Sequence, residues 1–241
     1  MKQPNTSSEI VIVPVTGVAN IGRGNLSTGA IHFALLNSML RRQTQVPVVP
    51  PIIPSHAGII GSFEAICRNF QHDVEQISEA FPAARKLFVG HSLGGLLARW
   101  YIATHDTDDH LLTIGTPNIP SDCGGLRNLA IGWRWRDINA FTADIPPITS
   151  SATRLAQIAC VHDGLIPAEV ALAPITESAA RHLLADRIHD HRPPSGVALH
   201  ETMLPDNHIS MIVSPDSAQA ITGIAQTMVA AAAPFSSGLV A

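Results

Sequence analysis

One glycine-rich hexapeptide, GHSLGG at Gly90–Gly95, constrains the fold of this chain more than any other segment. The apolar run Arg85–Val89 before it is typical of a short buried strand, and Leu93–His105 after it is typical of a helix. Ser92 stands at the turn between them, in the strand–turn–helix setting of a G-x-S-x-G nucleophile. A side chain on the glycine two residues before or after this serine would clash where strand and helix approach closely. The sequence therefore predicts a serine hydroxyl exposed above a sheet; the alternative is an inert serine in a glycine-rich turn.

The rest of the chain alternates short apolar runs with longer amphipathic ones. The apolar runs predict six strands: Ile10–Thr16, Val46–Val49, Lys86–Val89, Leu111–Ile114, Arg154–Val161 and Val197–Met203. The amphipathic runs predict helices at Ala30–Arg42, Ser62–Ala80, Leu93–His105 and Asp216–Ala232. Because the strands mostly lack polar alternation, they suit a parallel sheet covered on both faces. We expect a single α/β domain over residues 1–241, doubly wound, with a mainly parallel sheet of about six strands and helices on both faces.

Two segments interrupt this alternation, and both begin where a predicted strand ends. They are Asn118–Ser151 and Leu165–Ser195. Ligands bind beyond the carboxyl ends of strands in such sheets, so both segments should lie over the site. The first contains Trp133 and Trp135, which would make it a cap or lid that binds apolar groups of a substrate. The alternative is that these tryptophans only pack the insertion onto the sheet.

A nucleophilic serine needs a base to take its proton and a carboxylate to orient that base. His208 follows the last predicted strand and Asp163 follows the strand before it, so both should lie at the same sheet edge as Ser92. The chain order Ser, Asp, His is the one expected on this architecture. His91 adjoins the serine but should point away from it, and Asp206 is too close in sequence to His208 to reach its ring in line.

Two backbone N–H groups can stabilise the oxyanion that forms when a serine attacks an acyl group. Leu93 is expected at the first position of the helix, where its N–H has no partner within the helix. Val18 in the loop after the first strand is the second candidate donor, because Gly17 allows a tight turn just before it. This loop does not match the G-x-G-x-x-G pattern of a nucleotide site.

Several of these segments together resemble the α/β-hydrolase superfamily, in a compact form that lacks its first two strands. The resemblance rests on Val15–Gly17, Gly90–Gly95, Thr113–Pro117, Asp163–Pro167 and Asn207–His208. It is nearest to the lipase and esterase branch, including proteins similar to GPI inositol-deacylases and to bacterial triacylglycerol lipases. The resemblance implies a compact α/β-hydrolase fold with a cap insertion at residues 118–151. Thr16 is a departure, because such enzymes usually have a histidine at that position.

Composition excludes several other classes of protein. The formal net charge of −4 gives no sign of a nucleic-acid partner. No apolar run is long enough to span a membrane, and the first residues do not resemble a signal peptide, so the expected location is cytoplasmic. Three cysteines, Cys67, Cys123 and Cys160, lack metal-ligand spacing and form an odd count, which argues against a full disulfide framework.

The predicted function is that of a serine hydrolase that cleaves carboxylic esters of small-molecule or lipid-like substrates through an acyl-enzyme. This chemistry needs no metal and no organic cofactor. An acyltransferase with the same triad is an alternative, as is a non-catalytic binding protein on the same fold. A metal site is a further alternative, formed by His182, Asp186, His189 and His191. The sequence leaves the oligomeric state open.

Overall fold

A computed structural model of the chain describes most of the predicted elements. The described residues are 9–17, 28–54, 62–121, 132–150, 152–160, 162–163, 165–175, 199–204 and 212–232.

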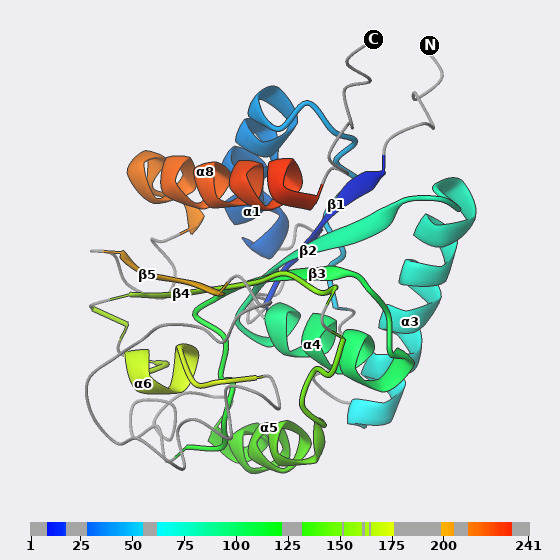
Figure 1. Ribbon diagram of the computed structural model, residues 1–241. Helices are drawn as coiled ribbons and strands as arrows, with labels where there is room; N and C mark the ends of the chain where they lie inside the picture. The colour runs from blue at the N-terminus through cyan, green and yellow to red at the C-terminus, as the bar shows by residue number, and fades with distance from the viewer. Residues whose placement is uncertain are drawn as a thin grey trace, which may run out of the picture.

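Five parallel strands form one sheet in this part of the chain (Figure 1). They are β1 (Ile10–Val15), β2 (Arg85–His91), β3 (His110–Ile114), β4 (Leu155–Cys160) and β5 (Leu199–Leu204). They lie in the order β1-β2-β3-β4-β5, and every adjacent pair is parallel. The carboxyl ends of all five strands therefore point to one edge of the sheet.

The predicted strand at 46–49 is present only as two isolated parallel bridges beside β1. Val48 pairs with Ile12 and Ile52 pairs with Val15. Prolines have no N–H to donate to a strand ladder. Pro47, Pro50 and Pro51 interrupt this segment, which explains why the pairing is discontinuous.

The chain leaves β1 on one side and returns to it on the other. The bridged segment around Val48 lies on one flank of β1, and β2 pairs with the opposite flank. Such a reversal opens a crevice at the strand carboxyl ends, which is the usual ligand site of open α/β sheets. The residues at this reversal are Thr16, which follows β1, and Ser92, which follows β2.

Helices cover both faces of the sheet (Figure 1). The helices α1 (Thr28–Gln43) and α8 (Pro215–Ala232) lie side by side on one face, and α3 (Phe63–Ala80) and α4 (Leu93–His105) lie on the other. The doubly wound, mainly parallel architecture predicted from the sequence is therefore confirmed. Among the described helices, none is long and apolar enough to cross a membrane.

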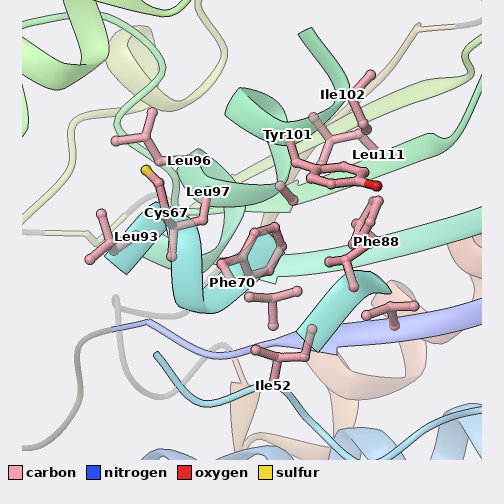
Figure 2. Close-up of a cluster of buried hydrophobic side chains, with 14 of the residues drawn as sticks. Ile52, Cys67, Phe70, Phe88, Leu93, Leu96, Leu97, Tyr101, Ile102 and Leu111 are labelled. Atoms are coloured by element: carbon pink, nitrogen blue, oxygen red, sulfur yellow. The ribbon is translucent and has the colours of Figure 1, made fainter. Parts of the chain in front are cut away.

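Alternating side chains of each strand feed two separate apolar clusters. In β1, Val11, Val13 and Val15 pack with α3 and α4, whereas Ile10 and Ile12 pack with α1 and α8. Figure 2 shows the first cluster, in which the rings of Phe70 of α3 and Tyr101 of α4 both pack against Phe88 of β2. Burial of both strand faces explains why the strand sequences show no polar alternation.

Two helices occur inside the segments that interrupt the alternation. They are α5 (Gly132–Asp144) and the short α6 (Ala168–Ala171). The sequence analysis did not predict them, because α5 has weak apolar periodicity and α6 spans only one turn. Both follow strands of the sheet, α5 after β3 and α6 after β4.

Candidate functional site

Ser92 occupies a strained turn between β2 and α4. Its backbone has φ 53° and ψ −126°, a conformation that residues with a side chain rarely adopt. The turn is held because Ser92 N–H donates to Ile114 of β3 at 2.9 Å and its carbonyl accepts from Gly95 N–H at 3.1 Å. Strain at a single serine at the carboxyl edge of a sheet is the geometry of a nucleophile elbow.

Glycine is required on both sides of the serine, because neighbouring atoms leave no room for a side chain there. A Cβ on Gly90 would lie 2.4 Å from the Cα of Gly95. A Cβ on Gly94 would lie 2.4 Å from the carbonyl oxygen of Val15. The predicted clash at both positions is confirmed, and the obstructing atoms belong to the backbone, which cannot rotate away.

The end of β1 lies directly against the serine. A Cβ on Gly17 would be 2.8 Å from the Cβ of Ser92. The loop that begins at Gly17 is therefore close enough to contribute to the site. Val18, the second candidate oxyanion donor, is the next residue and lies outside the described residues.

Leu93, the other candidate donor, is the first residue of α4, and its side chain is buried. Figure 2 shows it near Cys67 of α3 at the margin of the apolar cluster. N–H groups in the first turn of a helix have no carbonyl partner within the helix and carry its positive dipole end. This position is suited to stabilising an oxyanion formed at the serine.

His91 is directed away from the serine, as predicted. Its ring is buried and contacts Phe33 of α1, with centroids 6.2 Å apart. This buried histidine therefore packs on the face of the sheet that α1 covers, and α4 covers the opposite face.

Asp163 lies in the turn that follows β4, at the same edge of the sheet as Ser92. Its Oδ1 accepts hydrogen bonds from Leu165 N–H at 2.9 Å and from Ile166 N–H at 2.8 Å. The side chain is half-buried. Two backbone amides on one carboxylate oxygen fix the orientation of the carboxyl group, as a residue that orients a base requires.

The strand that leads to the predicted base ends near this edge as well. The last strand, β5, ends at Leu204, four residues before His208. His208 and Asp206 lie outside the described residues, so the role of His208 stays a prediction. The four residues of the alternative metal site, from His182 to His191, also lie outside them. Within the described residues, no group of three His, Cys, Asp or Glu side chains could hold a metal ion.

The two tryptophans of the insertion belong to α5. Trp135 is buried, donates its Nε1–H to the carbonyl of Ser121 at 2.7 Å, and packs in an apolar cluster with Ile166 and Val170. This contact fixes α5 to the segment that follows Asp163. Trp133 is in the first turn of α5, but its side chain is not among those described.

Sequence reasoning missed a cluster of three buried polar residues, Arg99, Asn118 and Gln157. Arg99 of α4 is 6% exposed, and its Nη1 donates to the carbonyl of Asn118. Burial lowers the pKa of Arg99 to about 10. The available signal was a lone arginine within the apolar run Leu93–Ile102.

The two described cysteines are core residues. Cys67 and Cys160 are both buried. Burial, with a smaller effect from Glu64, raises the pKa of the Cys67 thiol to about 12. A thiol that stays protonated is a poor nucleophile, so Cys67 is not a candidate nucleophile.

Comparison with known proteins identifies the fold. No protein-family model matches the chain, and no curated protein sequence matches it. Among solved structures, one from work on the metagenome-derived lipolytic enzymes LipS and LipT is similar, with a TM-score of 0.60 and 13% identity over 93% of this chain and 94% of the other. Mouse α/β hydrolase domain-containing protein 10 has a TM-score of 0.55 and 13% identity, over 96% and 93% of the two chains.

A third similar structure is XC6422 from Xanthomonas campestris, a member of the α/β serine hydrolases described as without a lid. Its TM-score is 0.55 and its identity 14%, over 96% of this chain and 86% of the other. The chain therefore has the α/β-hydrolase fold, and the resemblance drawn from the sequence is confirmed for the fold. At such identities the similarity shows the fold alone.

Proposed function

We propose that the chain is a serine hydrolase that cleaves carboxylic esters. The observation that carries this proposal is the geometry of Ser92, held at φ 53° between β2 and α4 with Gly17 packed against it. A strained, partly exposed serine at the carboxyl edge of a parallel sheet lies at the edge where ligands of such sheets bind. An ordinary serine in a turn would not require three glycines with no space for a Cβ.

In the proposed mechanism, the Oγ of Ser92 attacks the acyl carbon while His208 takes the hydroxyl proton. The tetrahedral intermediate collapses, the alcohol leaves with the proton that His208 returns, and an acyl-enzyme forms. A water molecule then attacks the acyl carbon in the same way and releases the acid. Asp163 orients the imidazole and stabilises its cation, a role that its two amide hydrogen bonds support.

The developing oxyanion is stabilised in this proposal by the N–H groups of Leu93 and Val18. Leu93 stands at the amino end of α4, next to the serine. Val18 follows Gly17, which packs against Ser92. Removing one such donor costs roughly 100- to 1,000-fold in turnover in other enzymes, so this pair would contribute strongly.

The substrate class proposed is a small-molecule or lipid-like ester. The LipS and LipT work concerns lipolytic enzymes, and another similar structure is a pyrethroid hydrolase, PytH, with a TM-score of 0.53 and 13% identity. Both kinds of protein are compatible with this proposal. Hydrolysis of p-nitrophenyl esters of graded chain length would define the acyl group that the site accepts.

A fluorophosphonate probe tests the nucleophile directly. The probe should label the wild-type protein and leave Ser92→Ala unlabelled. Asp163→Asn is an informative second variant, because an amide Oδ1 can still accept from Leu165 and Ile166 and keep the turn. Turnover of Asp163→Asn should nevertheless fall roughly 10⁴-fold, since the imidazole would be held in the wrong tautomer. His208→Ala should fall at least as far.

Two results would contradict the proposal. One is a covalent adduct that mass spectrometry places on a residue other than Ser92. The other is near-normal turnover in His208→Ala or Asp163→Asn while the fold is intact. Product analysis with an added alcohol in water separates a hydrolase from an acyltransferase by how the acyl-enzyme partitions: a hydrolase yields mainly the free acid, whereas an acyltransferase yields mainly the new ester.

A further inference from the structure

The polar group around Arg99 connects the helix of the nucleophile to the segment that carries the acid. Arg99 lies two turns along α4 from Ser92, and its guanidinium donates to the carbonyl of Asn118 in the loop after β3. Asn118 in turn donates its backbone N–H to Val170 at 3.2 Å and its Nδ2 to the carbonyl of Ala171. The loop after β3 thus bridges α4 and α6.

A second side chain holds the same segment from the sheet. Gln157 of β4 is fully buried, and its Nε2 donates to the carbonyls of Ala171 at 3.1 Å and Ala173 at 2.8 Å. Residues 170–173 are therefore fixed by hydrogen bonds from two directions. They begin only seven residues after Asp163, whose carboxylate is itself bound by the amides of Leu165 and Ile166.

The burial of Arg99 at this position has an unfavourable free energy. Its side chain is buried, and no carboxylate in the described part of the chain forms an ion pair with it. Burial of an unpaired guanidinium is unfavourable, and an apolar side chain of similar length often fits such a site at lower cost. Packing alone therefore does not account for the arginine, whereas its bond to the Asn118 carbonyl fixes the loop between nucleophile and acid.

We propose that Arg99 is a positioning residue, which acts through Asn118 to hold the segment 163–173 so that Asp163 is correctly placed relative to Ser92. This proposal rests on the proposed function. It assigns to Arg99 no contact with substrate. Its effect is on the rate of the chemical step, because misplacing a group by about 1 Å can cost roughly 100-fold in rate.

Paired substitutions separate positioning from stability. Arg99→Met removes the donors and the buried charge but keeps most of the side-chain volume. We expect kcat to fall roughly 10- to 100-fold with KM changed by less than about threefold, and Tm to be unchanged or higher. Arg99→Lys, which keeps a charge and a donor, should recover part of the loss.

The matched control is Lys86→Met. Lys86 is the other buried cation that the structure describes, paired with Asp109 at 3.6 Å at the opposite, amino edge of the sheet. Removing it leaves a buried carboxylate unpaired, so Tm should fall clearly. Because this pair is remote from the strand carboxyl ends, kcat should stay within about twofold of wild type, provided that assays are run below the lowered Tm.

Hydrogen exchange supplies a readout that does not depend on activity. The amides of Leu165 and Ile166 donate to Asp163, so their exchange rates report how firmly the carboxylate is held. Arg99→Met should exchange faster at these amides, and Lys86→Met should not. If Arg99→Met does not fold, Asn118→Ala is the substitute variant, because it loses the Nδ2 bond to Ala171. It should show the same lower kcat and the same faster exchange at Leu165 and Ile166.

Each outcome either supports or overturns the proposal that Arg99 positions Asp163. Wild-type exchange at residues 165–166 and wild-type kcat in Arg99→Met would overturn the proposal, as would an equal loss of kcat in Lys86→Met. Faster exchange with unchanged kcat in an active protein would also overturn it. Failure of the wild type to hydrolyse any ester or to bind the fluorophosphonate would instead overturn the proposed function, and the catalytic part of this proposal with it.

Discussion

Acid should destabilise this protein through one buried histidine at the start of β3. His110 is 0% exposed, and its Nδ1 accepts a hydrogen bond from Arg154 N–H at 3.2 Å. Burial lowers its pKa to about 4, and the charges of Arg85 and Arg154 act in the same direction against a smaller effect of Asp108. At neutral pH the ring is therefore neutral in the folded protein.

The size of the effect follows from the difference in the pKa of His110 between the folded and the unfolded protein. Unfolding returns the ring to its ordinary pKa of 6.5, from a pKa of about 4 in the fold. Each pKa unit corresponds to about 1.4 kcal/mol, so protonation favours the unfolded state by about 3 kcal/mol once the pH is below both values. The contribution of the neutral ring is complete above pH 6.5 and is lost progressively as the pH falls toward about 4.

Urea denaturation from about pH 8 to about pH 4 measures this contribution. Carboxylates also titrate in this range, so the comparison is between wild type and His110→Asn. The Oδ1 of this asparagine can still accept a hydrogen bond from Arg154 N–H. The difference in unfolding free energy between the two should shrink by about 3 kcal/mol across the range. His72→Asn, an exposed histidine of α3, is the control and should follow wild type. Parallel curves for wild type and His110→Asn would refute the reasoning.

Two further predictions concern the site and the insertion. Gly17→Ala would place a methyl group 2.8 Å from the Cβ of Ser92, so turnover should fall roughly 100-fold or more. The control is Gly223→Ala in α8, where a Cβ meets nothing within 4 Å. This variant should raise the free energy of unfolding by about 0.5–1 kcal/mol and leave ester hydrolysis unchanged. Equal activities of the two alanine variants would argue against a close approach of β1 to the serine. Trp135→Ala should cost about 3–5 kcal/mol in denaturant titrations, because its buried ring and its bond to Ser121 are lost. Trp133→Ala should flatten the rise of kcat/KM with acyl chain length, and an unchanged chain-length profile would exclude its proposed contact with substrate.

The sequence predicted best those features that depend on local patterns. Leu93–His105 was predicted as a helix with the bounds that the structure shows, because glycines mark its start and apolar residues continue through its buried length. The doubly wound, mainly parallel sheet with helices on both faces then followed from general rules of α/β topology, whereas the strand order became known only from the structure. The elbow was predictable too, since only close approach of two backbones explains glycines at positions 90 and 94.

Features that depend on distant contacts were not predictable. The helix α5 has no continuous apolar face, because its burial is divided between two neighbours. Trp135 packs against the segment after β4, whereas Phe141 stacks on Phe63 of α3 with ring centroids 4.8 Å apart. The bond of Arg99 to Asn118 could not be predicted either, since Asn118 is nineteen residues away and contributes a backbone carbonyl.

Different kinds of interaction therefore hold Ser92 and Asp163 in place. Ser92 is fixed by contacts between backbones, in which a Cβ on Gly94 would lie 2.4 Å from the carbonyl oxygen of Val15. Backbone atoms cannot rotate out of the way, so substitutions at the elbow should act in an all-or-none manner. Asp163 is instead held by the amides of Leu165 and Ile166, in a segment whose later residues Ala171 and Ala173 accept hydrogen bonds from the side chains of Asn118 and Gln157. Such bonds can lengthen or exchange partners individually, so substitutions there should change the rate in graded steps while the serine keeps its reactive geometry.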